Sequence, residues 1–133
     1  MTRFLLDTNT VSHLLRSHAE VTKRIQQVPM ASLGVSAITE GELLFGLARR
    51  PTALRLHRAV QEFLRRVDIL PWDRAAAAHY GLVRAGLSGQ GKAVAPLDLL
   101  IGCHALALER VLVSSDHAFR HIEGLMLEDW TLS

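Results

Sequence analysis

The sequence predicts an α/β domain in which helices cover both faces of a mostly parallel sheet of four to five strands. Two observations support this class. Short apolar runs alternate along the chain with longer stretches of helical periodicity. The predicted helices also fall between successive strands, as parallel pairing requires. The length of 133 residues is typical of one domain, so we expect residues 1–133 to form a single domain.

The first half of the chain begins with a short apolar strand that stops at a polar turn. Ser36 is placed to cap the helix that follows the second strand, and Pro51 stops that helix. In chain order, the predicted elements are a strand over 3–6, helices over 11–16 and 20–28, a strand over 32–36, a helix over 36–49 and an amphipathic helix over 52–66.

The second half continues the alternation. Pro71 closes the third strand, Asp73 caps an alanine-rich helix, and Pro96 opens the next helix. The predicted elements are a strand over 67–70, a helix over 73–87, a loop over 88–91, a helix over 96–108, a strand over 111–114, a turn or short helix over 116–122 and a fifth strand at 126–127.

Composition excludes several classes of protein. The single cysteine, Cys103, cannot form an intramolecular disulfide, and its apolar surroundings predict a buried, unreactive thiol. No apolar run approaches the ~20 residues of a membrane span, and no signal peptide is visible. We therefore expect a cytoplasmic protein with no membrane contact. Six arginines between residues 49 and 66 form either a solvated helix face or a phosphate-binding surface, and composition does not decide between them.

Four carboxylates fall at the same end of the predicted sheet. Asp7 ends the first strand and Asp116 follows the fourth, while Glu42 and Asp98 lie near the starts of two helices. In open parallel sheets, ligand sites form outside the carboxyl ends of the strands. Carboxylates that meet there repel one another and have raised pKa values, and a divalent cation removes that repulsion. Such a site is suited to phosphate chemistry.

Each acid also has a purely structural interpretation. Asp7 can cap the following helix, and Thr39 and Glu42 have the spacing of a capping box. Asp98 is favoured by the helix dipole whatever its function, and Asp116 can belong to an ordinary turn. These alternatives stay open for each residue alone. The shared location of all four acids favours a site.

The other ionisable residues point to structural roles. His117 and His121 have i,i+4 spacing and could bind zinc if helical, but the nearby sequence offers no third ligand. His104 lies on an apolar helix and is expected to be a core or interface residue. Surface or capping roles are expected for the remaining acids considered, which are Glu40, Asp68, Asp73 and Glu109.

Five blocks of sequence carry a resemblance to a known family. They are LLDTNTVSHLL, SAITEGELLFGLARRP, VDILPWDRAAAAHYGLVRAGL, APLDLLIGCHALA and VLVSSDHAFRHIEGLMLEDW. In this order and spacing, the chain resembles PIN-domain ribonucleases of the VapC toxin type, the toxic half of type II toxin–antitoxin pairs. The resemblance covers essentially the full length and implies a three-layer sandwich.

The resemblance implies a catalytic quartet and a metal. Asp7 matches the acid of the DTN motif, Glu42 the acid of the helix after the second strand, Asp98 the acid of the later helix and Asp116 the acid of the last turn. In the family this quartet holds one or two Mg²⁺ or Mn²⁺ ions. Asp7 and Asp98 are the implied direct ligands, with Glu42 and Asp116 acting through water.

Asn9 and Ser114 are implied to support the site. Ser114 and Ser115 depart from the usual threonine followed by asparagine or aspartate, and Gly102 with Cys103 replaces a common alanine pair. These small-for-small changes leave the acids intact. They bear mainly on the fit of the substrate.

The family implies metal-assisted hydrolysis of RNA that leaves a 5′-phosphate and a 3′-hydroxyl. The favoured substrate is tRNA, in particular the anticodon stem-loop of initiator tRNA. The implied partners are a cognate antitoxin, forming a hetero-oligomer, and a second copy in a homodimer. Leu44, Phe45 and Leu47, with the helix over 52–66, offer either apolar contact area for these partners or ordinary core packing.

The sequence is also compatible with two alternative functions. One is a catalytically inactive PIN-fold binding module, which the presence of all four acids argues against. The other is a receiver-type signalling domain with an acidic metal pocket. That domain needs adjacent acids after the first strand and a lysine after the last, whereas Leu6 precedes the single Asp7 and neither Lys23 nor Lys92 is suitably placed.

Overall fold

The computed structural model describes all residues from 1 to 133 and contains a five-stranded parallel sheet of order β3-β2-β1-β4-β5. The strands are β1 (Phe4–Leu6), β2 (Leu33–Ser36), β3 (Asp68–Leu70), β4 (Val111–Val113) and β5 (Leu127–Glu128). The helices are α1 (Thr8–Leu15), α2 (Ala19–Gln27), α3 (Ala37–Ala48), α4 (Leu54–Arg66), α5 (Arg74–Gly89) and α6 (Pro96–Leu108), with 3₁₀ helices η1 (Met30–Ser32) and η2 (His117–His121).

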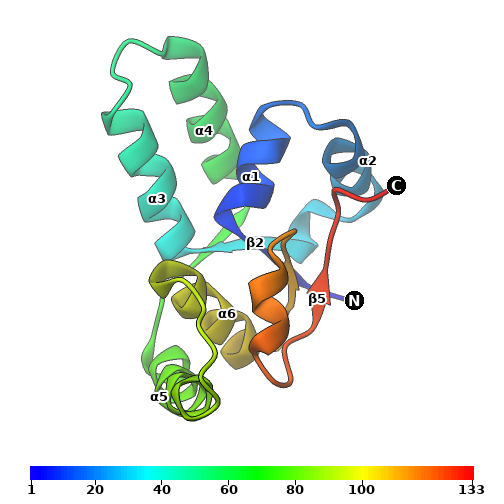
Figure 1. Cartoon of the computed structure of the whole chain (residues 1–133). Helices are drawn as coiled ribbons and strands as arrows, with labels where there is room; N and C mark the ends of the chain where they lie inside the picture. The colour runs from blue at the N-terminus through cyan, green and yellow to red at the C-terminus, as the bar shows by residue number, and fades with distance from the viewer.

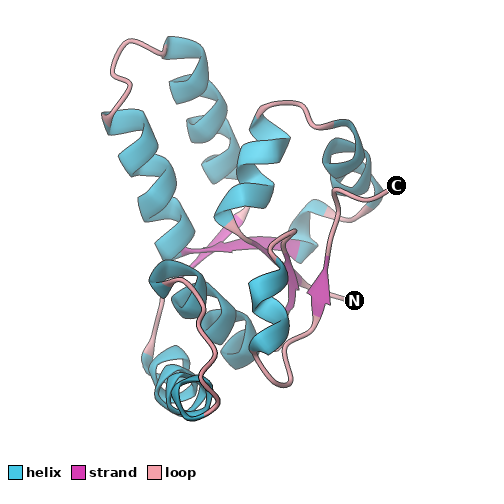
Figure 2. Ribbon diagram, in the orientation of Figure 1, coloured by secondary structure: helices cyan, strands magenta, loops and turns pink.

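The helices form two layers on opposite faces of the sheet, with α1 to α4 on one side and α5, α6 and η2 on the other (Figures 1 and 2). The order of the strands explains this division. From β1 to β3 the chain advances in one direction across the sheet, and from β3 to β4 it returns. Because such crossovers are right-handed, the reversal places the connecting helices on the opposite face. The predicted α/β class and three-layer arrangement are confirmed.

Two apolar cores lie on the two faces of the sheet. In β1, Phe4 and Leu6 join the core beneath α1 to α4, and Leu5 joins the core beneath α5 and α6. In β4, Leu112 joins the second core and its two neighbours join the first. Burial on both faces explains why these strands read as continuous apolar runs. No helix combines the length and the hydropathy that crossing a lipid bilayer demands.

The carboxyl ends of β1 and β4 lie side by side and are tied together. The backbone N–H of Asp7 donates to the carbonyl of Val113 at 3.1 Å, and the Thr10 hydroxyl donates to the same carbonyl at 2.9 Å. The chain leaves β1 toward β2 and leaves β4 toward β5, in opposite directions across the sheet. Such a switch point opens a crevice beyond the strand ends. The fold therefore provides a site next to Asp7.

Three predicted boundaries were wrong. Helix α1 begins at Thr8 instead of residue 11, because Asp7 caps it. Strand β5 pairs through Leu127–Glu128, one residue later than predicted. Helix α5 continues through Gly89, so the first half of the predicted loop over 88–91 is helical. It ends where Gly91 adopts a φ of +66°, a left-handed conformation that glycine accepts without strain.

Gly102 permits close contact between α6 and η2. A Cβ atom at this position would lie 2.6 Å from Cδ1 of Ile122 and 3.4 Å from the ring of Phe119. Both of those residues are buried in the second core. The glycine that departs from the family's usual alanine therefore accommodates a bulky neighbour.

We expect Gly102→Ala to lower the free energy of unfolding by about 1–3 kcal/mol, because the added methyl overpacks this contact. Adding Ile122→Val removes the Cδ1 atom and should recover part of the loss, which a double-mutant cycle in urea would measure. Gly81→Ala is the control, because a Cβ there meets nothing within 4 Å and should stabilise α5 by about 0.5–1 kcal/mol. Equal free energies of unfolding for Gly102→Ala and Gly81→Ala would contradict this account.

Candidate active site

Asp7 is buried at the switch point between β1 and β4. Its side chain is 2% exposed, and its Oδ1 accepts a hydrogen bond from the backbone N–H of Thr10 at 2.8 Å. The helix-capping interpretation is thus correct, and the same residue also interacts electrostatically with Asp98 and Asp116. Burial raises the pKa of Asp7, while hydrogen bonds from Ser114 and Thr10 act in the opposite direction. The negative charge of Asp116 raises the pKa further.

Glu42 is held by a side chain from another element. Its Oε1 accepts a hydrogen bond from the Thr8 hydroxyl at 2.7 Å. The Thr8 hydroxyl also lies 3.2 Å from the hydroxyl of buried Thr39. Ser36 caps α3 by accepting from the backbone N–H of Ile38 at 3.1 Å. The capping-box interpretation of Glu42 is therefore wrong, and this acid faces α1.

Asp98 interacts electrostatically with the other three acids. It is half-buried in the first turn of α6, and its pKa is raised to about 6. Burial is the largest cause, followed by the negative charges of Asp116, Asp7 and Glu42. A hydrogen bond shared with Asp116 also favours the protonated form. The four acids therefore converge from four separate segments of the chain.

Asp116 occupies the turn after β4. Its Oδ1 accepts from the backbone N–H of Ala118 at 2.9 Å and caps η2. Its own backbone N–H donates to the Ser114 hydroxyl at 3.0 Å. The turn interpretation is correct, and it coexists with the charge interaction between Asp116 and Asp98. Ser114 is buried beside two of the acids.

The donor set suits a hard divalent cation. All four groups are carboxylates, and none belongs to the three ion pairs of the chain, which join Arg24 to Glu128 and Arg65 and Arg66 to Glu62. As they stand, the side chains form no group of three or more His, Cys, Asp or Glu that could hold a metal ion. Mg²⁺ commonly takes one or two carboxylates directly and keeps several waters.

A groove of about 310 Å³ between α1, α3 and α4 begins at Thr8 and Glu42. Arg49 and Arg50 line its further part, and the Arg49 guanidinium lies 5.5 Å from the ring centroid of Phe45. Arg65 and Arg66 instead pair with Glu62 on the surface of α4. The arginine-rich stretch thus divides between a groove and a solvated helix face.

The apolar residues of α3 do not all face outward. Leu44 and Phe45 are 49% and 63% exposed, whereas Leu47 is buried in the first core. Most of the apolar face of α4 also packs on that core, with Val60 buried and Val67 buried just after the helix. Leu47 is therefore a core residue, whereas Leu44 and Phe45 are exposed enough to contact a partner.

Threonines near the acids were missed as site residues. Asn9 is exposed, while its neighbours Thr8 and Thr10 make the contacts to Glu42 and to the end of β4. Thr39 completes the hydroxyl cluster from α3. The sequence feature that could have identified these threonines is the presence of hydroxyl residues on both sides of Asn9 and in the helical turn before Glu42.

His104 links the two helices that carry Glu42 and Asp98. Its ring is fully buried, and Nδ1 lies 2.8 Å from the Ser36 hydroxyl that caps α3. Burial lowers the pKa of His104, so the ring is neutral in the folded chain at neutral pH. Its neighbour Cys103 is buried, and burial raises the pKa of the thiol to about 11, which confirms the predicted unreactive cysteine.

Comparisons with known proteins identify relatives of this chain. A family model described as the PIN domain matches residues 4–125. The chain is 30% identical to the tRNA(fMet)-specific endonuclease VapC of Shigella flexneri, covering 98% of this chain and 100% of that protein. It is 33% identical to ribonuclease VapC2 of Haemophilus influenzae, covering 98% and 99% of the two chains.

A solved structure agrees over the same length. The DNA-bound VapBC of Salmonella typhimurium is similar with a TM-score of 0.90 and 32% identity, covering 98% of this chain and 99% of that one. The full-length agreement confirms the resemblance seen in the five sequence blocks. It also rules out the receiver-type alternative.

Asp98→Asn should stabilise the metal-free chain at neutral pH. The pKa of Asp98 is about 6 in the folded chain against 3.8 ordinarily, so the folded chain binds more protons between these values. Its contribution to stability is therefore highest below about pH 4 and is lost as the pH rises to about 6. We expect the variant to gain about 1 kcal/mol at pH 7.5 after allowance for solvent screening, and nothing at pH 4.

Urea unfolding in EDTA at the two pH values would measure this gain. Glu20→Gln is the matched control, because Glu20 also lies in the first turn of its helix but is remote from the cluster. A variant that is less stable than the wild type at pH 7.5 would show that the acids do not repel one another.

Proposed function

We propose that this chain, which belongs to the PIN-domain family of VapC ribonucleases, is the toxin of a type II toxin–antitoxin pair and an endoribonuclease. The observation that carries the proposal is the convergence of four acids on Asp98 at the switch point of the sheet. We further propose that residues 1–133 form one ribonuclease domain acting in the cytoplasm. The catalytic assignment is Asp7, Glu42, Asp98 and Asp116.

The proposed cofactor is Mg²⁺, with Mn²⁺ as a substitute. Asp7 and Asp98 would hold the ion directly, and Glu42 and Asp116 would contribute through water. When bound, the ion supplies positive charge that stabilises the phosphate and lowers the pKa of water. The oxygen donors, the absence of ion-paired cations and the raised pKa of Asp98 support this assignment.

The residues of the chain keep this site in order. The Thr8 hydroxyl orients the Glu42 carboxylate, and the backbone N–H of Thr10 orients Asp7. Asp98 holds a proton below about pH 6 in the metal-free chain, so a cation must compete with that proton. Cleavage should therefore weaken as the pH falls through this range.

The proposed substrate is tRNA, with the anticodon stem-loop of initiator tRNA as the favoured target. Two relatives at 30% and 32% identity carry the name tRNA(fMet)-specific endonuclease. Arg49 and Arg50 line the groove that begins at Glu42, where they could contact phosphates of the RNA backbone. The proposed products carry a 5′-phosphate and a 3′-hydroxyl.

The proposed partners are a cognate antitoxin and a second copy of the chain. The solved neighbours include VapBC complexes from Salmonella typhimurium and Rickettsia felis, both bound to DNA. The same groove offers apolar lining from Phe45 and Leu56 and includes Glu42, one of the four acids. An antitoxin segment lying there would exclude RNA from the site, which explains inhibition by simple competition.

Asp7→Asn and Glu42→Gln should each reduce tRNA cleavage with Mg²⁺ by about 100-fold or more, because each removes a charge from the cation site. The assay is cleavage of tRNA by the purified chain, followed by sequencing of the new 5′-phosphate ends. Glu40→Gln is the control, since Glu40 lies on the same helix two residues from Glu42 and belongs to no acid pair in the site. It should cleave within about twofold of the wild type.

EDTA should abolish cleavage, and added Mn²⁺ should restore it. Wild-type rates for Asp7→Asn in Mg²⁺ would refute the mechanism. A wild-type chain that binds tRNA and yields no new ends would instead identify an inactive binding module.

A further inference from the structure

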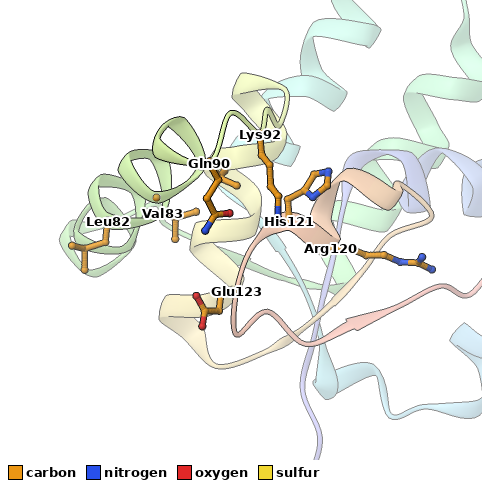
Figure 3. Close-up of a pocket in the computed structure, with 9 residues that line it drawn as sticks. Leu82, Val83, Gln90, Lys92, Arg120, His121 and Glu123 are labelled. Atoms are coloured by element: carbon orange, nitrogen blue, oxygen red, sulfur yellow. The ribbon is translucent and has the colours of Figure 1, made fainter.

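A second cavity lies between the end of α5 and η2. It is open to solvent, has a volume of about 520 Å³ and is lined by the C-terminal part of α5, the loop before α6, and η2 with the residues after it (Figure 3). This volume is within the range of about 300–1,000 Å³ typical of small-ligand pockets. None of its lining residues belongs to the groove that begins at Glu42.

The backbone at Lys92 is anchored by the end of α5. The N–H of Gly91 donates to the carbonyl of Ser88 at 3.2 Å, and the N–H of Lys92 donates to the carbonyl of Leu87 at 2.9 Å. This is a Schellman motif, completed by the left-handed Gly91. The lysine side chain extends toward His121 on η2 (Figure 3). Lys92 belongs to none of the three ion pairs of the chain.

The two segments that carry Lys92 and His121 each lie within a few residues of one of the proposed catalytic acids. The loop that carries Lys92 enters α6 at Pro96, and Asp98 lies in the first turn of that helix. Asp116 caps η2, which carries His121. Five residues of a 3₁₀ helix rise about 10 Å, which is about three phosphate spacings along one strand of a duplex. An RNA held at the acids would therefore extend over this cavity.

Charge also favours RNA at this position. Four carboxylates repel a polyanion, so binding energy must come from cations beside them. Arg49 and Arg50 supply positive charge on the side of α3. Lys92 and Arg120 supply it on the side of η2, where Glu123 is the only acid that lines the cavity. Cationic groups thus flank the acids on two sides.

The remaining lining suits a base. Leu82 and Val83 provide an apolar wall from α5, and Gln90 offers an amide that both donates and accepts hydrogen bonds (Figure 3). RNA is recognised mainly through unpaired bases that leave the stack and enter such pockets. Glu123 repels phosphate from one part of the cavity and so favours its approach to Lys92.

We propose that this cavity is a subsite for one unpaired nucleotide of the RNA, about three phosphates away from the bond that is cleaved. Lys92 binds the phosphate, Gln90 contacts the edge of the base, and Leu82 and Val83 contact its face. The proposal rests on the proposed ribonuclease function and adds a determinant of substrate choice to it.

The test measures RNA binding in a chain that cannot cleave. In an Asp7→Asn background, filter binding of unfractionated bacterial tRNA is followed against salt concentration. Adding Lys92→Gln should weaken binding about fivefold and reduce the slope of log K against log salt by about 0.7–0.9, the value for one phosphate contact. Adding Gln90→Ala should weaken binding with no change of slope, because the lost contact is neutral.

Lys23→Gln is the matched control, because it removes the only other lysine, which is exposed on α2. It should leave both the affinity and the slope unchanged. If Lys92→Gln behaves like Lys23→Gln, the subsite does not exist. If the Lys92 and Gln90 variants change the oligomeric state in sedimentation and leave RNA binding unchanged, the cavity is a protein interface and the proposal is wrong.

Cleavage of the same tRNA by the otherwise wild-type chain separates the two proposals. Lys92→Gln should raise KM and leave kcat nearly unchanged, since Lys92 contacts RNA away from the reacting atoms. If the wild type cleaves and its KM does not respond to Lys92→Gln, only the subsite is refuted. If the wild type neither binds nor cleaves tRNA, the proposed function and the subsite are both refuted.

Discussion

The repulsion among four carboxylates at the end of the sheet is the constraint on which the rest of the site depends. Asp7 is buried without an ion pair, and burial together with the charges of three other acids raises the pKa of Asp98 to about 6. Packing elsewhere must offset the cost of holding these groups together, which is a common relation between stability and function. A cation bound as proposed would remove this cost, and its binding would then stabilise the folded chain.

Hydrogen bonds to residues outside the four acids fix the relative positions of the segments that carry the acids. The Val113 carbonyl accepts from both the Asp7 N–H and the Thr10 hydroxyl, which joins the ends of β1 and β4. The Thr8 hydroxyl connects α1 to Glu42 on α3. The contact between His104 and Ser36 connects the core of α6 to the start of α3. Each of these contacts joins elements that are remote in sequence, so the relative positions of the acids depend on the whole fold.

The surface around the acids is divided by charge and polarity. The groove between α1, α3 and α4 combines arginines with apolar side chains such as Phe45, whereas the cavity beside η2 combines Lys92 with an aliphatic wall. An RNA substrate and an inhibitory protein segment bind such surfaces through different interactions. The RNA needs cations and exposed aliphatic faces for its bases, while a protein segment gains mostly from apolar burial. In the proposed function, the acid cluster serves catalysis and the two flanking surfaces select which molecules bind beside it.

The sequence by itself determined the class of fold and the end of the sheet at which the acids lie. Apolar runs, helix caps at Ser36 and Asp73 and the proline at 96 are local signals, and they predicted most elements correctly. Only the tertiary structure decided that Glu42 accepts from Thr8 instead of capping its own helix, and that Leu47 enters the core while Phe45 remains exposed. It also decided that Gly102 faces Ile122 and that Lys92 shares a cavity with His121. These outcomes depend on contacts between segments 20 to 34 residues apart, which no periodicity along the chain encodes.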